Sequence, residues 1–368
     1  MKETERLLLA ALRFAIRGEA EPWSETLEAR TQYALMELAQ SQALLPVLAQ
    51  AVHDSPGIFS KEALSYLEKY ARQLTIGQAA RTAEFLQLYA ALEENGLHPA
   101  VIKGLVCRDL YPHPEQRAST DEDFLLPEEE RFRCKAALLA DGLQLVKEDA
   151  DEAAYRDDDR GLYLEVHLRP FPSDSSAYGD CNRFFPDALS RTEAIRAYGC
   201  EIRTLCPTDH LLFLLLHAYK HVLHGGVGLR QLCDICLFAE RRGEAVDWPY
   251  IRRCCREQRI EQLAAAIFQI GERHLGIPAP EAFADVETDE LPLLKDSLSG
   301  GMFGADDPDR LHSSTLTLEA VSASKKGKRP LGALHSLFLP AASLSGRYPY
   351  LKKRPWLLPA ARERTCAR

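Results

Sequence analysis

The sequence lacks any apolar run approaching the roughly 18 to 20 residues that a membrane-spanning helix needs. Its longest obvious apolar block is Leu211 to Leu216. Near the N-terminus, charged residues surround a short apolar stretch that Arg13 interrupts, and no small-residue cleavage site of a secretory signal follows. These absences predict a cytoplasmic protein with no membrane partner.

Positive charge is also scarce. Lys and Arg number 45 against 54 Asp and Glu, which gives a net charge of −9 over 368 residues. That balance disfavours broad contact with a nucleic-acid backbone, although a local basic patch can still bind one. Glycine and proline, 21 of each, are too few for a long flexible linker, and 46% hydrophobic residues suffice for a sizeable core. We therefore expect a folded chain of two or three structural units.

The ten cysteines do not follow the regular spacing of a small disulfide-stapled domain, so we expect reduced thiols. The pairs Cys233-x-x-Cys236 and Cys254-Cys255 leave a tetrahedral zinc site open as an alternative. Both pairs lie in stretches with a helical pattern, and the second pair is adjacent rather than spaced. Buried apolar thiols are the favoured interpretation.

Apolar residues recur at helical spacing up to Asn95, and the last helix of this region should run from about Lys61 to Glu94 and stop at Asn95-Gly96. The pattern changes at Pro99. AVIKG and DEDFLL are typical of buried strands, and each precedes a helical stretch, LVCRDLY and then PEEERFRCKAALLADG. EAAYR and LYLEVHLRPF flank a turn at Asp157 to Gly161 and predict a hairpin.

These patterns predict an α+β fold in which a small mixed-sheet core is embedded in predominantly helical N- and C-terminal regions. We expect a helical region over 1–95, the α+β core over 96–205, a helical domain lining the cleft over 206–278, and an irregular C-terminal region docked on the body over 279–368.

Acidic side chains gather on two of the predicted strands. Side chains alternate between the faces of a strand, so Asp121 shares a face with Asp123, and Glu165 shares one with His167. Three carboxylates then converge, a costly arrangement that divalent cations relieve, and oxygen ligands favour Mg²⁺ or Mn²⁺. Such ions activate an attacking oxygen and stabilise a leaving pyrophosphate. A D-x-D pair alone also occurs on solvated strands and in turns.

The order of IKG, LYPHPEQR, TDEDFLL and YLEVHLRPF resembles the bacterial nucleotidyltransferase family of the polymerase-beta-like superfamily, in its branch usually left uncharacterised. The similarity extends to PTDHLLFLLLHAYKHVLHGGVGLRQLCDICLF and RYPYLKKRPWLLP, and so covers most of the chain. It implies a small mixed sheet with helices and Mg²⁺-dependent transfer of a nucleoside monophosphate from an NTP such as ATP. The acceptor would be a hydroxyl or phosphate, and pyrophosphate would be released.

The resemblance also implies roles for the acidic residues. Asp121 and Asp123 would hold the metals, and Glu165 would be the third carboxylate, which activates the acceptor hydroxyl. Glu165 stands where Asp is usual in the family, and Glu122 occupies a position that is normally apolar and faces the core of the sheet. A buried carboxylate there is expected to disturb the packing of the strand.

Nucleotide-binding residues follow from the same resemblance. Lys103 and Gly104 match the loop that meets the triphosphate, although Gly-Ser or Gly-Gly is commoner there, and Arg117 would neutralise phosphate charge. Backbone N-H groups near Gly104 are also suited to a phosphate because a predicted strand gives way to a helix at this point.

A second polar cluster lies in the helical region after Pro207. His217, Lys220 and His221 fall near one helical face. Two His four residues apart can bind a metal, but we favour a cleft-facing helix on which Lys220 or His221 contacts the nucleotide or acceptor. The residues expected to support the site without binding the nucleotide are His167, His217, Arg230 and Asp234.

Two further classes of function stay open. Glu122 and the atypical loop favour a catalytically degenerate member that binds nucleotide or a partner protein as a scaffold. The basic C-terminal stretches, such as Lys325 to Arg329, would suit a transferase acting on RNA, which the net charge disfavours. A protein, peptide or small molecule is thus preferred to RNA as acceptor. No motif specifies the acceptor itself, the base of the NTP or the oligomeric state.

Overall fold

A computed structural model describes residues 1–18, 23, 25–173, 175, 177–301 and 321 of the chain. One continuous cluster of buried apolar side chains extends from Leu8 on the first helix, through the central sheet, to Leu298 and Val321. Within these residues no helix combines the length and apolar character needed to cross a bilayer.

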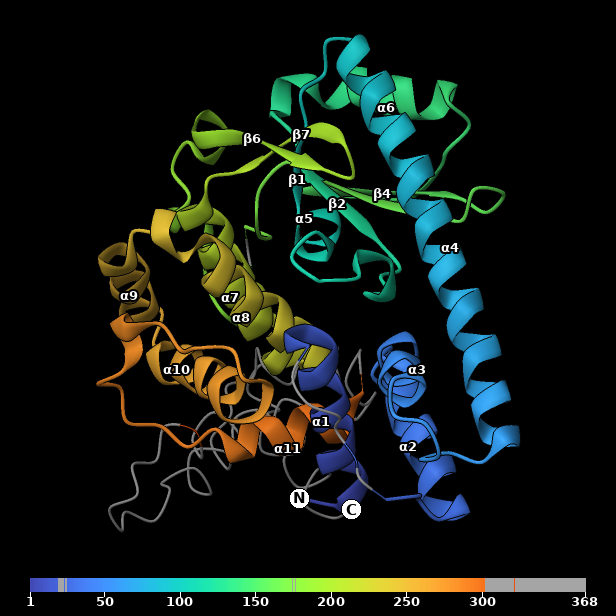
Figure 1. The fold of residues 1–368 in the computed structure, drawn as a ribbon. Helices are drawn as coiled ribbons and strands as arrows, with labels where there is room; N and C mark the ends of the chain where they lie inside the picture. The colour runs from blue at the N-terminus through green and yellow to red at the C-terminus, as the bar shows by residue number, and fades with distance from the viewer. Residues whose placement is uncertain (19–22, 24, 174, 176, 302–320, 322–368) are drawn as a thin grey trace, which may run out of the picture.

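Four N-terminal helices precede the sheet: α1 (Glu3–Arg17), α2 (Ala29–Ser41), α3 (Leu45–His53) and α4 (Lys61–Glu94). The Ser60 hydroxyl accepts a hydrogen bond from the Ala63 amide and so caps the start of α4. The helix ends at Asn95, where Gly96 has a left-handed φ of 69°. The predicted bounds of α4 are therefore confirmed. Figure 1 shows α4 running from α2 and α3 past the sheet to α6 (Arg131–Ala140).

Seven strands form one mixed sheet in the order β3-β4-β5-β2-β1-β7-β6. Its parallel pairs are β2 with β5 and β1 with β7, and the other neighbours are antiparallel. The strand bounds are β1 Ala100–Ile102, β2 Glu122–Leu125, β3 Gln144–Glu148, β4 Glu152–Asp157, β5 Leu162–His167, β6 Thr192–Ala197 and β7 Cys200–Leu205. The predicted α+β class is thus confirmed, as are the strands β1 and β2 and the β4–β5 hairpin.

Sequence patterns did not reveal β3, β6 or β7. Every residue of β3 is exposed, so this edge strand has no apolar alternation to detect. The β6–β7 hairpin turns at Tyr198 and Gly199, which both have positive φ, and its strands carry several exposed polar residues. The pairing of β7 with β1, and of β6 with β7, supplies what the local pattern lacks.

The C-terminal part of the described chain is mainly helical. Its helices are α7 (Pro207–His224), α8 (Leu229–Arg242), α9 (Trp248–Glu257), α10 (Glu261–Ile270) with a π-helical extension over Gly271–Leu275, and α11 (Leu291–Gly300). The region after 278 was expected to be irregular, which is wrong for α11. The rest of that prediction, including Lys325 to Arg329 and the docking of the C-terminal segment, lies outside the described residues.

The four paired cysteines lie in α8 and α9 and are at most 2% exposed. Burial raises the pKa of the Cys236 thiol to about 12, so it stays neutral. This agrees with the interpretation of these residues as small apolar thiols.

A buried ion pair joins β2 to α5 (Gly104–Arg108). The Glu122 Oε1 lies 2.5 Å from Nη2 of Arg108, a side chain with no exposed surface. Arg108 also donates to the Ser119 hydroxyl. Burial raises the pKa of Glu122, and the neighbouring guanidinium acts against that rise. The expectation that Glu122 disturbs strand packing is wrong, because its charge is paired inside the protein.

Gly104 leaves the space that this pair needs. A Cβ atom added at Gly104 would lie 2.5 Å from Oε2 of Glu122, well inside contact distance. A side chain at the first position of α5 would therefore force the Glu122 carboxylate to move away from its place beside Arg108.

We predict that Arg108→Met, which leaves Glu122 buried without its counter-ion, lowers the free energy of unfolding by about 3 to 5 kcal/mol. The double variant Arg108→Met/Glu122→Leu should lower the free energy of unfolding by less than the sum of the two single changes, because no unpaired charge remains. Urea denaturation measures both. Arg156→Met, which breaks the exposed pair with Asp158, is the control and should cost at most about 1 kcal/mol. Additive losses in the double variant would contradict the pairing.

Gly104→Ala should destabilise the protein by about 1 to 3 kcal/mol, since the new methyl group displaces the locked Glu122 carboxylate. The matched control is Gly77→Ala within α4, where the added Cβ meets nothing closer than 3.6 Å. That change should stabilise the helix by about 0.5 to 1 kcal/mol. If thermal or urea unfolding shows that both substitutions change the free energy of unfolding in the same direction, the close approach at Gly104 is not a constraint.

Candidate active site

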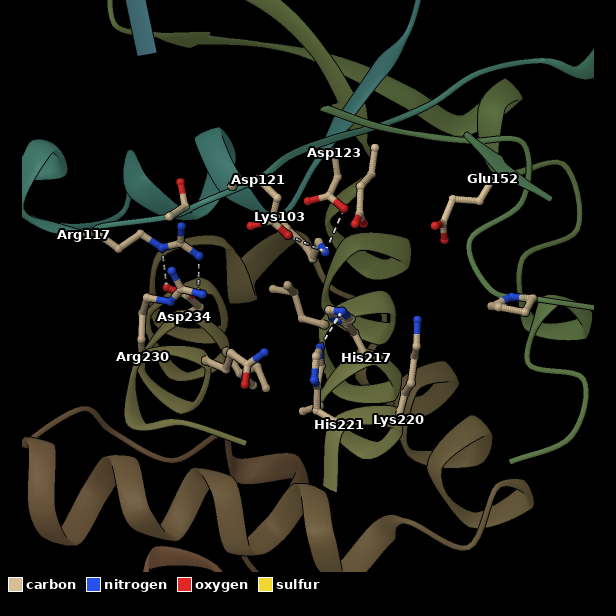
Figure 2. A pocket seen from close by; sticks show the side chains of 18 of the residues that line it. Lys103, Arg117, Asp121, Asp123, Glu152, His217, Lys220, His221, Arg230 and Asp234 are labelled. Carbon is tan, nitrogen blue, oxygen red and sulfur yellow. Dashed lines mark hydrogen bonds and ion pairs between the residues drawn. The ribbon is translucent and has the colours of Figure 1, made fainter. Parts of the chain in front are cut away.

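The candidate site is a cavity of about 370 Å³ between the sheet and the helices α7 and α8 (Figure 2). It gathers nearly all of the residues singled out from the sequence. Those that line it are Lys103, Gly104, Arg117, Asp121, Asp123, Glu165, His217, Lys220, His221, Arg230 and Asp234. His167 lies directly behind this lining, where it is hydrogen-bonded to Asp123.

The register of two parallel strands sets the acidic group. Asp123 on β2 is opposite Glu165 on β5, and His167 follows two residues later on the same face. Alternate residues of β5 are buried in the core, which turns Glu165 and His167 toward the site. Ligand atoms of Asp123, Glu165 and His167 all lie within 4.8 Å of one another. Asp121 lines the same cavity but does not belong to this tight group of three.

The Asp123 carboxylate is 1% exposed and lies between two cations. Its Oδ1 is 2.8 Å from Nζ of Lys103 and 3.1 Å from Nε2 of His167. Burial alone would raise the pKa of Asp123, but these neighbours outweigh it and hold the pKa well below its ordinary value. The carboxylate is therefore ionised at neutral pH.

The two cations respond in the opposite sense. Burial alone would lower the pKa of Lys103, but the carboxylates of Asp123 and Asp121 raise it above its ordinary value. Burial would likewise lower the pKa of His167, whereas its hydrogen bond to Asp123 and the nearby Glu165 carboxylate raise it to about 9. Both side chains thus carry positive charge at neutral pH and compensate the acidic group.

The donor chemistry of this group fits a hard divalent cation. Asp123 and Glu165 offer carboxylate oxygens, the ligand type that Mg²⁺ and Mn²⁺ prefer, and Asp121 offers another from the same cavity. Across the described part of the chain, no other set of three or more His, Cys, Asp or Glu brings ligand atoms this close together. The metal identity does not follow from the donors alone.

The turn that carries Lys103 has a strained backbone. Lys103 has φ 54° and ψ −116°, which is rare for a residue with a side chain. Its amide donates to Nε2 of His210 at 3.3 Å, and the other ring nitrogen of His210 is 3.0 Å from the Thr204 hydroxyl. That hydroxyl donates to the Val101 carbonyl, so Nδ1 of His210 is the donor toward Thr204. This series of hydrogen bonds holds the turn in place.

His210 was not among the residues found from the sequence, because a lone histidine in an apolar helical stretch gives no signal of its partners. The side chain is fully buried, and burial lowers the pKa of His210 to about 3. A neutral imidazole is what the hydrogen bond from Lys103 requires, since Nε2 must accept it.

The helix α7 provides the facing wall. Nε2 of His217 and Nε2 of His221 are 3.1 Å apart, so the two rings bond to each other. Burial, followed by the charge of Lys103, lowers the pKa of both, to about 4 for His221. The pKa of Lys220 is also lowered, first by burial and then by Lys103. Both imidazoles are therefore neutral at pH 7.

The helix α8 holds Arg117 through Asp234. Nε and Nη2 of Arg117 lie 3.0 and 2.5 Å from the two carboxylate oxygens, and the Tyr111 hydroxyl donates to Oδ1 of Asp234 at 2.8 Å. Burial would lower the pKa of Arg117, but Asp234 outweighs it and raises the pKa. Arg117 thus lines the cavity as a fixed cation.

Two further cavity residues were not found from the sequence. Glu152 at the start of β4 and Lys147 on β3 both line the cavity and lie 3.3 Å apart at Oε1 and Nζ. Oε2 of Glu152 is also 3.8 Å from Nδ1 of His167. The predicted hairpin contained Glu152, but only the three-dimensional pairing of β4 with β5 places it opposite His167.

The comparisons with known proteins fit this architecture. Residues 28–276 match a family model described as an uncharacterised nucleotidyltransferase. No curated protein matches the sequence.

Two solved structures show distant likeness. One is the solution structure of the antibiotic-resistance factor ANT(2'')-Ia, with 14% identity and a TM-score of 0.38, covering 54% of this chain and 100% of that chain. The other is a crystal structure of ANT(2'')-Ia in complex with adenylyl-2''-tobramycin, with 16% identity and a TM-score of 0.36, covering 48% and 95%. Scores this low support no inference about function.

The family match spans more than half of the chain, from α2 to the end of the π-helical extension of α10. The protein therefore belongs to the uncharacterised nucleotidyltransferase family and is a nucleotidyltransferase.

Proposed function

We propose that the protein transfers a nucleoside monophosphate from an NTP to an acceptor hydroxyl or phosphate, with Mg²⁺ or Mn²⁺ as cofactor and pyrophosphate as the second product. The observation that carries this proposal is the parallel register of Asp123 and Glu165, with Asp121 in the same cavity. Basic side chains of Arg117, Lys220 and Arg230 line that cavity too.

Asp121, Asp123 and Glu165 would hold the divalent cation, and the donor set of the cavity supports this assignment. When bound, the cation supplies positive charge to the phosphate oxygens and to the attacking oxygen. Lys103 and His167 already balance the charge of Asp123, which keeps that carboxylate ionised without a metal.

The nucleotide would be bound by cations and neutral donors around the carboxylates. Lys103 and Gly104 lie at the turn proposed to meet the triphosphate, and Arg117 neutralises phosphate charge while Asp234 holds it in place. Lys220 and His221 face the same space from α7 and would contact the nucleotide or the acceptor.

Glu165 is proposed to accept the proton of the acceptor hydroxyl. The acceptor oxygen then bonds to the α-phosphorus, the bond from the α-phosphorus to its bridging oxygen breaks, and pyrophosphate leaves with that oxygen. Glu165 is 26% exposed at its side chain, so an acceptor can reach it, while Asp123 is buried. This difference in exposure supports a base role for Glu165 and a ligand role for Asp123.

The alternative is a degenerate scaffold that binds nucleotide without turnover. One of its two supports was the misplaced charge of Glu122, and the pair with Arg108 removes that reason. The atypical Lys103-Gly104 turn is the remaining support. A scaffold would retain NTP binding by calorimetry and give no product with any acceptor.

We predict that Asp123→Asn lowers the rate of NMP transfer by about 1,000-fold or more, because the buried charge that would hold the cofactor is lost. Incubation with each labelled NTP, Mg²⁺ or Mn²⁺, and a panel of protein, peptide and small-molecule acceptors measures transfer and pyrophosphate release. The control is Asp158→Asn at the exposed tip of the β4–β5 hairpin, which should act as wild type. Equal rates for wild type and Asp123→Asn would refute catalysis at this site.

Removal of divalent cations should reduce transfer to background, and added Mg²⁺ or Mn²⁺ should restore it, since the proposed ligands are carboxylates. The assay is transfer before and after chelation with EDTA, followed by readdition of each metal. Transfer that persists after complete chelation would contradict the assigned role of Asp121, Asp123 and Glu165.

A further inference from the structure

Arg230 is a buried cation without a counter-ion. It begins the first turn of α8, is 9% exposed, and lines the cavity. Its Nη1 donates to the Ala118 carbonyl, but its Nε has no hydrogen-bond partner. Among the described residues no carboxylate lies within ion-pair distance of it. A buried charge in this condition is costly unless something anionic completes it.

Arg117 also has a buried nitrogen without a hydrogen-bond partner, although it does have a counter-ion. Asp234 occupies Nε and Nη2 of Arg117, while its Nη1 is buried and has no partner. Arg117 and Arg230 line the cavity together, on the same side of Lys103 in Figure 2. Burial, then the charge of Arg117, lowers the pKa of Arg230, and the carboxylates of Asp234 and Asp121 act against that fall. Asp234 is paired with Arg117 and not with Arg230, so Arg230 brings a positive charge that Asp234 does not pair, and N-H donors of both guanidinium groups remain unused.

We infer that Arg117 and Arg230 form a subsite for the terminal phosphates of a polyphosphate chain, with Asp234 as the residue that positions Arg117. The planar fork of a guanidinium matches phosphate oxygens, and two such groups suit a ligand with several adjacent charges. The assignment of that chain to an NTP rests on the proposed function. It gives Arg230 direct contact with the substrate rather than a supporting place behind the site.

The subsite also assigns the two sides of the cavity to different substrates. In Figure 2, Arg117, Arg230 and Asp234 lie on one side of Lys103 and Asp123, and Glu152 lies on the other. A polyphosphate bound to the two arginines would leave from one side of the carboxylates, and the acceptor would approach Glu165 from the Glu152 side. The in-line geometry of phosphoryl transfer requires such opposed positions for leaving and attacking oxygens.

The test measures binding of inorganic tripolyphosphate and of AMP by calorimetry in EDTA, so that no metal contributes. Arg230→Gln should weaken tripolyphosphate binding by about tenfold or more, and should change AMP binding by less than about threefold. Arg241→Gln, an exposed arginine on the same helix, is the matched control and should bind as wild type. Melting temperatures check that each variant is folded.

The opposite results would overturn the inference. These are a wild-type protein that does not bind tripolyphosphate, a folded Arg230→Gln that binds it as wild type does, or an equal loss for AMP, which would indicate a single-phosphate site such as one for a phosphorylated acceptor. If Arg230→Gln does not fold, Arg230→Lys replaces it. That variant keeps the charge without the fork, and should bind tripolyphosphate about threefold or more weakly than wild type; unchanged binding would again overturn the inference.

The experiments can refute the proposed subsite and the proposed function independently of each other. Asp123→Asn should retain tripolyphosphate binding in EDTA while it loses transfer. If the wild type binds tripolyphosphate through Arg230 but transfers no nucleotide to any acceptor, the subsite stands and the catalytic proposal fails.

Discussion

A single buried carboxylate organises the site. Asp123 is ionised in the interior, and that charge is tolerated because Lys103 and His167 lie on either side of it. Each partner comes from a different element, the β1–α5 turn and β5, so the charge ties three segments of the sheet together. Within the same group Glu165 is more exposed than Asp123, which suits the additional role proposed for it as the residue that takes a proton from the acceptor.

The surroundings keep this arrangement rigid. The strained turn at Lys103 is held by its amide bond to His210, and the strand that carries Asp123 is joined to α5 through the buried pair of Glu122 with Arg108. His210, Glu122 and Arg108 do not line the cavity, so they position the reactive groups without occupying the space for substrate. Preorganised charges of this kind do not have to reorient during a reaction.

Local sequence patterns predicted which residues gather at the centre of the site, but not which residues surround them. Strand alternation in DEDFLL and YLEVHL predicted that acidic residues would share faces, and the cavity contains them, although their roles stay predictions. Glu152 and His210 could not be found, because their importance depends on pairing between strands and on a contact across 107 residues. Glu122 was misjudged for a related reason. Its partner Arg108 belongs to a different element, and a charge at a core position has a different meaning once it is paired.

We propose that the carboxylates around Asp123 bind a divalent cation beside a triphosphate. Anomalous diffraction from crystals soaked with Mn²⁺ and a non-hydrolysable NTP would locate both ligands. We expect a manganese peak at bonding distance, about 2.0 to 2.3 Å, from carboxylate oxygens of Asp123, with the phosphates directed toward Arg117 and Arg230. A nucleotide bound elsewhere, or manganese absent from the cavity while Lys103 remains bonded to Asp123, would contradict it.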